Sequence, residues 1–191
     1  MLKVYLASTS PRRLELLGTL GIPFQAISPR FEERPTDLPA AEEALYFAEQ
    51  KARSVADLCP HAFVIASDTL IDCDGIKMGK PHDAKEAVQM LTQLSGKTHT
   101  VCTAVVLLDT ESGDLKKHVE RAAVTFKRLT QKTIEEYVAT GEPLDKAGAY
   151  AIQEKGQVLI SKVEGDVQAV IGLPVSMVKE WLIPSPEPIE I

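Results

Sequence analysis

The segment Ser8-Thr9-Ser10-Pro11-Arg12-Arg13 combines three hydroxyl groups with two adjacent arginines, directly after a short apolar run. Residues 3–7 predict a buried strand, and Ser10 followed by proline is typical of a helix N-cap and first helical position. A helix N-terminus is already positive, so Arg12 and Arg13 are unfavourable there unless an anion is bound. A triphosphate would supply that anion. A solvated arginine pair beside an ordinary N-cap is the alternative, and the motif alone favours neither.

Asp68 follows residues 63–66, an apolar run that predicts a buried strand. We expect the carboxylate at the C-terminal end of that strand, the edge at which open α/β sheets bind ligands. A carboxylate in this position can hold a divalent cation or act as a general base. An aspartate that caps the following turn is the simpler interpretation when the residue is taken alone.

Two further segments carry groups that suit a nucleotide. Lys80, in Gly79-Lys80-Pro81, could place an ammonium on a phosphate, although the spacing is not that of a phosphate-binding Walker A loop. Residues 142–153 bring charged side chains, a glycine and the amide of Gln153 into one loop and strand. The amide carries both a donor and an acceptor, which suits the edge of a base. A solvated lysine and a plain surface loop are the alternatives.

Composition limits the classes of protein that fit. The 191 residues are 45% hydrophobic and 25% charged, as in an ordinary globular domain. No apolar run approaches the ~20 residues of a membrane helix, and the N-terminus lacks a signal-peptide core. Three cysteines without a CxxC pair argue against a disulfide framework or zinc site. We therefore expect a cytoplasmic protein that does not bind membranes.

The charge is negative overall but uneven. A net charge of −6 argues against nucleic-acid binding. Residues 1–30 nevertheless hold four basic side chains against Glu15 alone, which suits a small anionic ligand.

Periodicity predicts an α/β fold with a mixed β-sheet flanked by helices, in which residues 100–109 and 119–129 form an antiparallel hairpin. We expect one domain over residues 1–182 and a Pro-rich tail over 183–191. The expected helices are 11–18, 40–58, 81–94, 131–140 and 173–182, and the other expected strands are 3–7, 24–28, 63–66, 149–152 and 158–163.

Eight stretches, taken together, resemble one known family across nearly the whole chain, from Leu6 to Leu182. They are 6–17, Lys51-Ala52, Ser67-Asp68-Thr69, Gly79-Lys80-Pro81, 94–103, 142–153, Gly165-Asp166 and 171–174. In this order and spacing they resemble the Maf family of nucleoside triphosphate pyrophosphatases. The resemblance implies two lobes around a deep nucleotide cleft, a homodimer, and hydrolysis between the α- and β-phosphates with a divalent metal, Mg²⁺ or Mn²⁺.

The resemblance also implies roles for particular residues. Asp68 would be the catalytic base, and Glu33 would join it near the metal, with Glu32 as the alternative because that loop matches loosely. The phosphates would be held by Ser8, Arg12, Arg13, Lys51 and Lys80.

The trio Arg12, Thr69 and Gln153 is similar to the branch that acts on dTTP and UTP. The branch that prefers 7-methylguanosine triphosphate tends to carry Gln after the catalytic Asp, and that activity is one alternative. The other alternative is a nucleotide-binding regulator of cell division with little turnover. One departure from the family pattern is Gln168-Ala169, because an Asn often precedes the following Val170.

Overall fold

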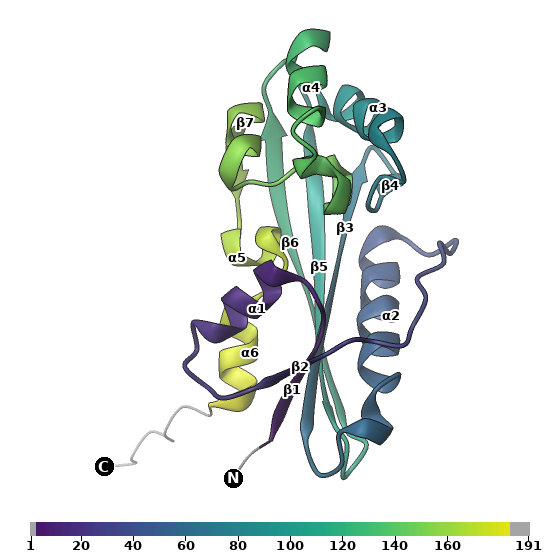
Figure 1. The fold of residues 1–191 in the computed structure, drawn as a ribbon, viewed down its shortest axis with the longest axis vertical. Helices are drawn as coiled ribbons and strands as arrows, with labels where there is room; N and C mark the ends of the chain where they lie inside the picture. Colours follow the sequence, from purple (N-terminus) through teal and green to yellow (C-terminus); the bar gives the residue numbers. More distant parts are fainter. Residues whose placement is uncertain (1–2, 184–191) are drawn as a thin grey trace.

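The computed structural model describes residues 3–183, so most of the expected tail lies outside the described residues. A seven-stranded sheet runs along the long axis of the molecule (Figure 1). Its strands are β1 (Val4–Ala7), β2 (Gln25–Ile27), β3 (Phe63–Cys73), β4 (Ile76–Met78), β5 (Thr98–Asp109), β6 (Leu115–Phe126) and β7 (Ile160–Glu164). The α-helices are α1 (Pro11–Gly18), α2 (Ala40–Arg53), α3 (Ala84–Leu94), α4 (Gln131–Val138), α5 (Val167–Ile171) and α6 (Val175–Leu182).

The sheet is mixed, as the sequence predicts. Its strand order is β2-β1-β3-β5-β6-β7, and β4 pairs with the far end of β3. The β1 strand is parallel to β2 and β3, whereas the neighbouring strands β3, β5, β6 and β7 are successively antiparallel. The expected hairpin of β5 and β6 is confirmed.

Helices cover the two ends of the sheet differently and so create two lobes. In Figure 1, α1, α2 and α6 surround the lower end, with β1 and β2, and α3 and α4 lie at the upper end with β4 and β7. In the lower lobe, Val64 of β3 packs in the cluster beneath α2, and the next residue, Ile65, packs with α1 and α6. This alternation follows from the period of two along a strand.

The helix α2 lies close to the sheet because its inner face is built from alanine. Ala44, Ala48 and Ala52 recur every four residues and are fully buried. Spacing of four keeps them on one side of the helix. The same face continues to Lys51, which is therefore carried to the sheet.

The structure corrects the expected position of Asp68. The strand β3 continues to Cys73, so Asp68 lies in the middle of the strand, opposite Ala104 of β5. The polar run at residues 67–69 does not end the strand because the buried Ser67 hydroxyl donates to the carbonyl oxygens of Ala104 and Gly172. Apolar residues resume at Leu70.

The expected strand at residues 149–152 is also wrong. Three short 3₁₀ helices occupy this region: η2 (Glu142–Asp145), η3 (Ala147–Ala149) and η4 (Glu154–Leu159). Gly148 and Ala149 have φ of 67° and 61°, a left-handed conformation that interrupts an extended chain. A Cβ on Gly148 would lie 2.9 Å from Ile71 Cγ1, so the turn packs directly on β3.

Smaller differences concern element ends. The helix α2 stops at Arg53 and is followed by the 3₁₀ helix η1 (Ala56–Leu58). The helix α3 begins at Ala84 rather than Pro81, because the Asp83 side chain accepts from the Glu86 N–H and caps it. The helix α5 was not expected from periodicity. Asp166 caps it by accepting from the N–H groups of residues 168 and 169.

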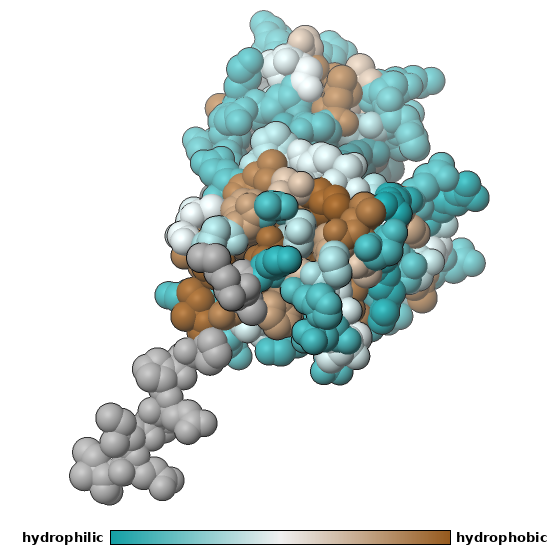
Figure 2. Space-filling model, turned by 60° about the horizontal axis from the view of Figure 1, so that its bottom comes forward, coloured by the Kyte–Doolittle hydropathy of each residue, from teal (hydrophilic) through white to brown (hydrophobic). Residues whose placement is uncertain are grey.

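The surface of the described chain mixes apolar and polar residues. Figure 2 shows hydrophobic residues gathered across the middle of one face, with hydrophilic residues around them. Exposed large hydrophobic side chains include Val158 and Val167. All three cysteines are buried and free. None of the helices between residues 3 and 183 has the length and apolar content to cross a membrane.

Candidate active site

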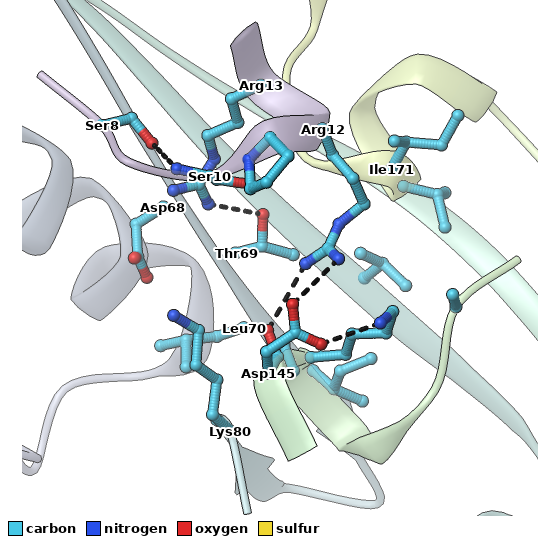
Figure 3. A pocket seen from close by; sticks show the side chains of 18 of the residues that line it. Ser8, Ser10, Arg12, Arg13, Asp68, Thr69, Leu70, Lys80, Asp145 and Ile171 are labelled. Atoms are coloured by element: carbon cyan, nitrogen blue, oxygen red, sulfur yellow. Dashed lines mark hydrogen bonds and ion pairs between the residues drawn. The ribbon is translucent and has the colours of Figure 1, made fainter. Parts of the chain in front are cut away.

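The site lies where the sheet loses a neighbouring strand. The β1 strand pairs with residues 63–65 of β3, and β4 pairs with residues 71–73. Between these partners the edge of β3 is open within the described chain, and Asp68 lies in this gap. A cavity of about 310 Å³ lies in this gap between the lobes (Figure 3). Its volume is in the range of small-molecule sites.

The nine residues to which the resemblance assigns roles all line this one cavity, whereas the alternative Glu32 does not line it and pairs with Arg34. The nine residues are Ser8, Arg12, Arg13, Glu33, Lys51, Asp68, Thr69, Lys80 and Gln153. They come from the loop after β1, from α1, from the loop before α2, from α2 and β3, and from two loops of the upper lobe. The structure therefore brings together chemistry that is spread over most of the chain.

Lys51 joins two carboxylates at the deep end of the cavity. Its Nζ lies 2.5 Å from Asp68 Oδ1 and 2.5 Å from Glu33 Oε1. The Lys51 and Asp68 side chains are each 7% exposed, whereas Glu33 is 41% exposed. Removing either partner of such a pair would leave the other charge buried and unpaired, which destabilises the fold.

The surroundings shift the two carboxylates in opposite directions. Burial raises the pKa of Asp68 above its usual range, although the charges of Lys51 and Arg13 act against this shift. Partial burial also opposes ionisation of Glu33, but Lys51, Lys80 and Arg13 outweigh it and lower the pKa of Glu33. The site thus holds one readily ionised carboxylate and one that accepts a proton more easily.

Arg13 is held deep in the cavity by neutral oxygens. Its Nε donates to the carbonyl oxygen of Gly172 at 2.9 Å, and Nη2 donates to Thr69 Oγ1 at 3.4 Å. Thr69 also lies 3.1 Å from the Thr103 hydroxyl, which fixes its position. Burial lowers the pKa of Arg13. The charges of Asp68 and Glu33 act against that shift, and the Arg13 guanidinium lines the cavity.

Arg12 has different partners from Arg13. Its Nη1 donates to Asp145 Oδ2 at 3.3 Å and its Nη2 to the Asp145 carbonyl at 3.4 Å. This contact joins α1 of the lower lobe to η2 of the upper lobe. Figure 3 shows Arg12 turned toward Asp145, away from Asp68. The two arginines of one motif therefore serve opposite ends of the cavity.

The loops that carry Ser8 and Lys80 are fixed by backbone contacts. The Ser8 side chain is buried, and its Oγ accepts from the Ser10 N–H, so Ser10 occupies the N-cap position without a side-chain cap of its own. The Gly148 N–H donates to the Gly79 carbonyl at 2.9 Å. This bond holds the loop of Lys80 against the η3 turn, facing Glu33.

Sequence reasoning missed several residues of the site. Asp145 and Lys146 line the cavity and are bonded to each other at 2.8 Å. They lie in the 142–153 segment, but no local sequence pattern indicated which side chains they would contact. Tyr150 also lines the cavity, and its hydroxyl is 2.7 Å from His99 Nε2. Burial lowers the pKa of His99 to about 4, so the imidazole that contacts Tyr150 is neutral at pH 7.

A second missed feature fixes the loop that carries Glu33. Glu43 is buried in α2 and accepts from the Thr36 hydroxyl at 2.8 Å and from Lys77 Nζ at 2.9 Å. Lys77 also donates to the carbonyl oxygens of Thr36 and Leu38. The loop before α2 is therefore tied to β4.

The residues present fit a divalent cation that a ligand helps to hold. Within residues 3–183 no group of three or more His, Cys, Asp or Glu side chains is placed to bind a metal. Asp68 and Glu33 nevertheless both contact the Lys51 ammonium, so the two carboxylates lie close together. Mg²⁺ is commonly held by one or two carboxylates, with water and substrate phosphates as the other ligands.

The fold and the site define a mixed α/β protein with a cationic cleft between two lobes, suited to a phosphate-bearing ligand. Residues 3–184 match the family model described as Maf-like protein, and the chain belongs to this family. The expected family resemblance is therefore confirmed.

Similar curated proteins share nearly the whole chain. A "dTTP/UTP pyrophosphatase" of Moorella thermoacetica is 48% identical over 183 residues, covering 95% of this chain and 94% of the relative. A protein of the same name from Bacillus velezensis is 46% identical, covering 91% and 92%. Another from Akkermansia muciniphila is 45% identical and covers 94% of both chains.

A solved structure named as a nucleoside-triphosphatase / dITP/XTP pyrophosphatase, from Mycobacterium abscessus, is also similar. It aligns with a TM-score of 0.48 and 17% identity, over 96% of this chain and 100% of that chain. At this distance the likeness says nothing about the site.

Proposed function

We propose that this protein is a nucleoside triphosphate pyrophosphatase that hydrolyses dTTP and UTP to the monophosphate and pyrophosphate. The observation that carries the proposal is the convergence of five cationic side chains and a buried carboxylate on one cavity. The names of the similar proteins support the same activity and the same bases. Thr69 directly after Asp68 supports this branch over the one that acts on 7-methylguanosine triphosphate.

The triphosphate would lie at the deep end of the cavity. Ser8, Arg13, Lys51 and Lys80 would hold its oxygens, since they surround the two carboxylates there. Arginine and lysine in a water-poor site stabilise the charge of a transferring phosphoryl group. Arg12 was expected both to bind phosphate and to set specificity, and its contact with Asp145 supports the second role.

Asp68 would act as the general base. Its raised pKa makes the carboxylate a better proton acceptor than an ordinary aspartate. It would take a proton from the water that attacks the phosphorus, while the cations hold the phosphates in line. Glu33 has a lowered pKa and would stay ionised beside it.

The expected cofactor is a divalent cation, Mg²⁺ or Mn²⁺, held by Asp68 and Glu33. When bound, it would supply positive charge to the phosphate oxygens. The remaining expectations, one domain over residues 1–182 and a cytoplasmic homodimer that binds neither membranes nor nucleic acid, stay predictions.

Release of pyrophosphate from a panel of nucleoside triphosphates tests the proposal. The panel holds dTTP, UTP, CTP, GTP and 7-methylguanosine triphosphate, each with Mg²⁺ or Mn²⁺. We expect fastest turnover of dTTP and UTP, with the monophosphate as the second product. Nucleotide binding without turnover would instead indicate a regulator, and preference for the methylated guanine nucleotide would overturn the assigned branch.

A further inference from the structure

Asp145 is an acidic side chain that lines the cavity between two cations. Lys146 Nζ donates to its Oδ1 at 2.8 Å, and Arg12 Nη1 donates to its Oδ2 at 3.3 Å. The three side chains therefore form a row of donor, acceptor and donor. Figure 3 shows the Arg12 and Asp145 part of this row, away from Asp68. We call this row the Asp145 row.

The Asp145 row keeps hydrogen-bonding capacity for a ligand. A carboxylate offers about four acceptor positions, and the contacts with Arg12 and Lys146 use one on each oxygen. The Asp145 side chain is 63% exposed, so its other positions are accessible. Lys146 also donates to the Glu142 carbonyl at 2.7 Å, which leaves one of its three N–H groups.

Apolar groups lie next to the Asp145 row. Ala147, Tyr150 and Ile152 line the same cavity from the upper lobe, and Ile171 lines it from the lower lobe. The Tyr150 ring is fixed by its hydroxyl contact with His99. A ligand with apolar faces and a polar edge suits these surroundings, and a nucleobase has that form.

The polarity of the Asp145 row is fixed. Arginine and lysine can only donate, and an ionised carboxylate can only accept. Partial burial opposes ionisation of Asp145, but Lys146 and Arg12 outweigh it and hold its pKa below the usual range. Gln153 differs, because an amide can turn to present either its donor or its acceptor. Strict discrimination between bases therefore needs Asp145 more than Gln153.

We infer that Asp145, flanked by Arg12 and Lys146, is the specificity-determining residue that reads the edge of uracil and thymine by accepting their N3–H; this inference rests on the proposed function. Both bases present an acceptor, a donor and an acceptor at O4, N3 and O2. That sequence matches the Asp145 row in either direction. Cytosine carries an amino group and an N3 lone pair instead, so it sets donor against donor and acceptor against acceptor.

The substitution Asp145→Asn tests the inference because the amide can also donate to N3 of cytosine. We expect kcat/KM for UTP to fall and the preference for UTP over CTP to shrink at least ~10-fold. A preference that stays within twofold of the wild-type value would overturn the inference. Asp57→Asn is the matched control, because Asp57 forms a similarly exposed pair with Arg30 outside the cavity.

Titration calorimetry with UMP, CMP and N3-methyl-UMP tests the same inference through binding alone, without turnover. The wild-type protein should bind N3-methyl-UMP at least ~10-fold more weakly than UMP, and Asp145→Asn should narrow that gap. Equal binding of UMP and N3-methyl-UMP by the wild type would overturn the inference. If the base preference is found in binding but no triphosphate is hydrolysed, the inference stands and the proposed function fails.

Discussion

The two ends of the cavity are built from the same kinds of groups in different surroundings. At the deep end, Lys51 and Asp68 pair with side chains that are each 7% exposed. At the other end, Arg12 and Asp145 pair with side chains that are 27% and 63% exposed. A buried pair loses much stability when one partner is removed, whereas an exposed pair contributes little.

This difference separates chemistry from recognition. Burial shifts the pKa of Asp68 and couples the deep end to the stability of the fold. The Asp145 row remains close to water and can change with little effect on folding. Substitutions at the deep end should therefore alter turnover and stability together, and those at the Asp145 row should alter kcat/KM and base selectivity with little change in stability.

The largest effect is expected for Asp68→Asn. The amide keeps the shape of the side chain but cannot take a proton, so kcat for dTTP should fall by about 10³-fold, within the range of general-base catalysis. The Kd for dTTP should stay within a few-fold, because the cations remain. Steady-state kinetics and calorimetry measure the two quantities, and near-normal turnover would remove Asp68 as the base.

The second-largest effect is expected on the stability of the Lys51→Met variant. The change leaves Asp68 and Glu33 facing each other without the ammonium, and the free energy of unfolding should fall by about 3–5 kcal/mol at pH 7. Urea unfolding measures this loss. Arg12→Met is the control at the exposed end and should cost no more than about 1 kcal/mol. Equal losses in the two variants would contradict the comparison.

A smaller effect with a defined pH dependence is expected for Glu43→Gln. Burial opposes ionisation of Glu43, but its hydrogen bonds to Lys77 and Thr36 outweigh it and lower its pKa. A carboxylate whose pKa is lowered in the folded state stabilises the fold at pH values above its pKa in the unfolded state, about 4.3. That contribution is lost as the pH falls through the folded pKa.

Unfolding of wild type and Glu43→Gln across this pH range checks the prediction. The variant should be less stable by about 1–3 kcal/mol at pH 7, and the difference should shrink below pH ~4. A difference that does not change with pH would show that the Glu43 charge has no such role.

The smallest effect is a shift in the pH profile of the wild-type enzyme. Because burial raises the pKa of Asp68, the acid limb of kcat should lie above the usual aspartate value of about 3.9. Activity should rise with pH through that limb as Asp68 loses its proton. A limb at or below the ordinary value would indicate that Asp68 is not titrating in the rate-determining step.

Local signals in the sequence were sufficient for most elements of the fold. The alanine face of α2, the hairpin of β5 and β6, and the Thr130 cap of α4 are each set by residues close in the chain. The extent of β3 was not predictable in this way. Its polar centre is tolerated because Ser67 finds partners 37 and 105 residues away.

The site shows the same limit. The motifs predicted one site for nine residues, and all nine line one cavity. The motifs did not indicate that Arg12 and Arg13 have different partners. The contact of Arg12 with Asp145 spans 133 residues. It depends on how the two lobes meet, which no local pattern encodes.

A crystal structure of the Asp68→Asn variant with UTP and Mg²⁺ tests the central claim most directly. We predict that the triphosphate contacts Arg13, Lys51 and Lys80 at the deep end, and that the N3–H of uracil lies against Asp145. A nucleotide bound in the reverse direction, or outside the cavity, would contradict the account.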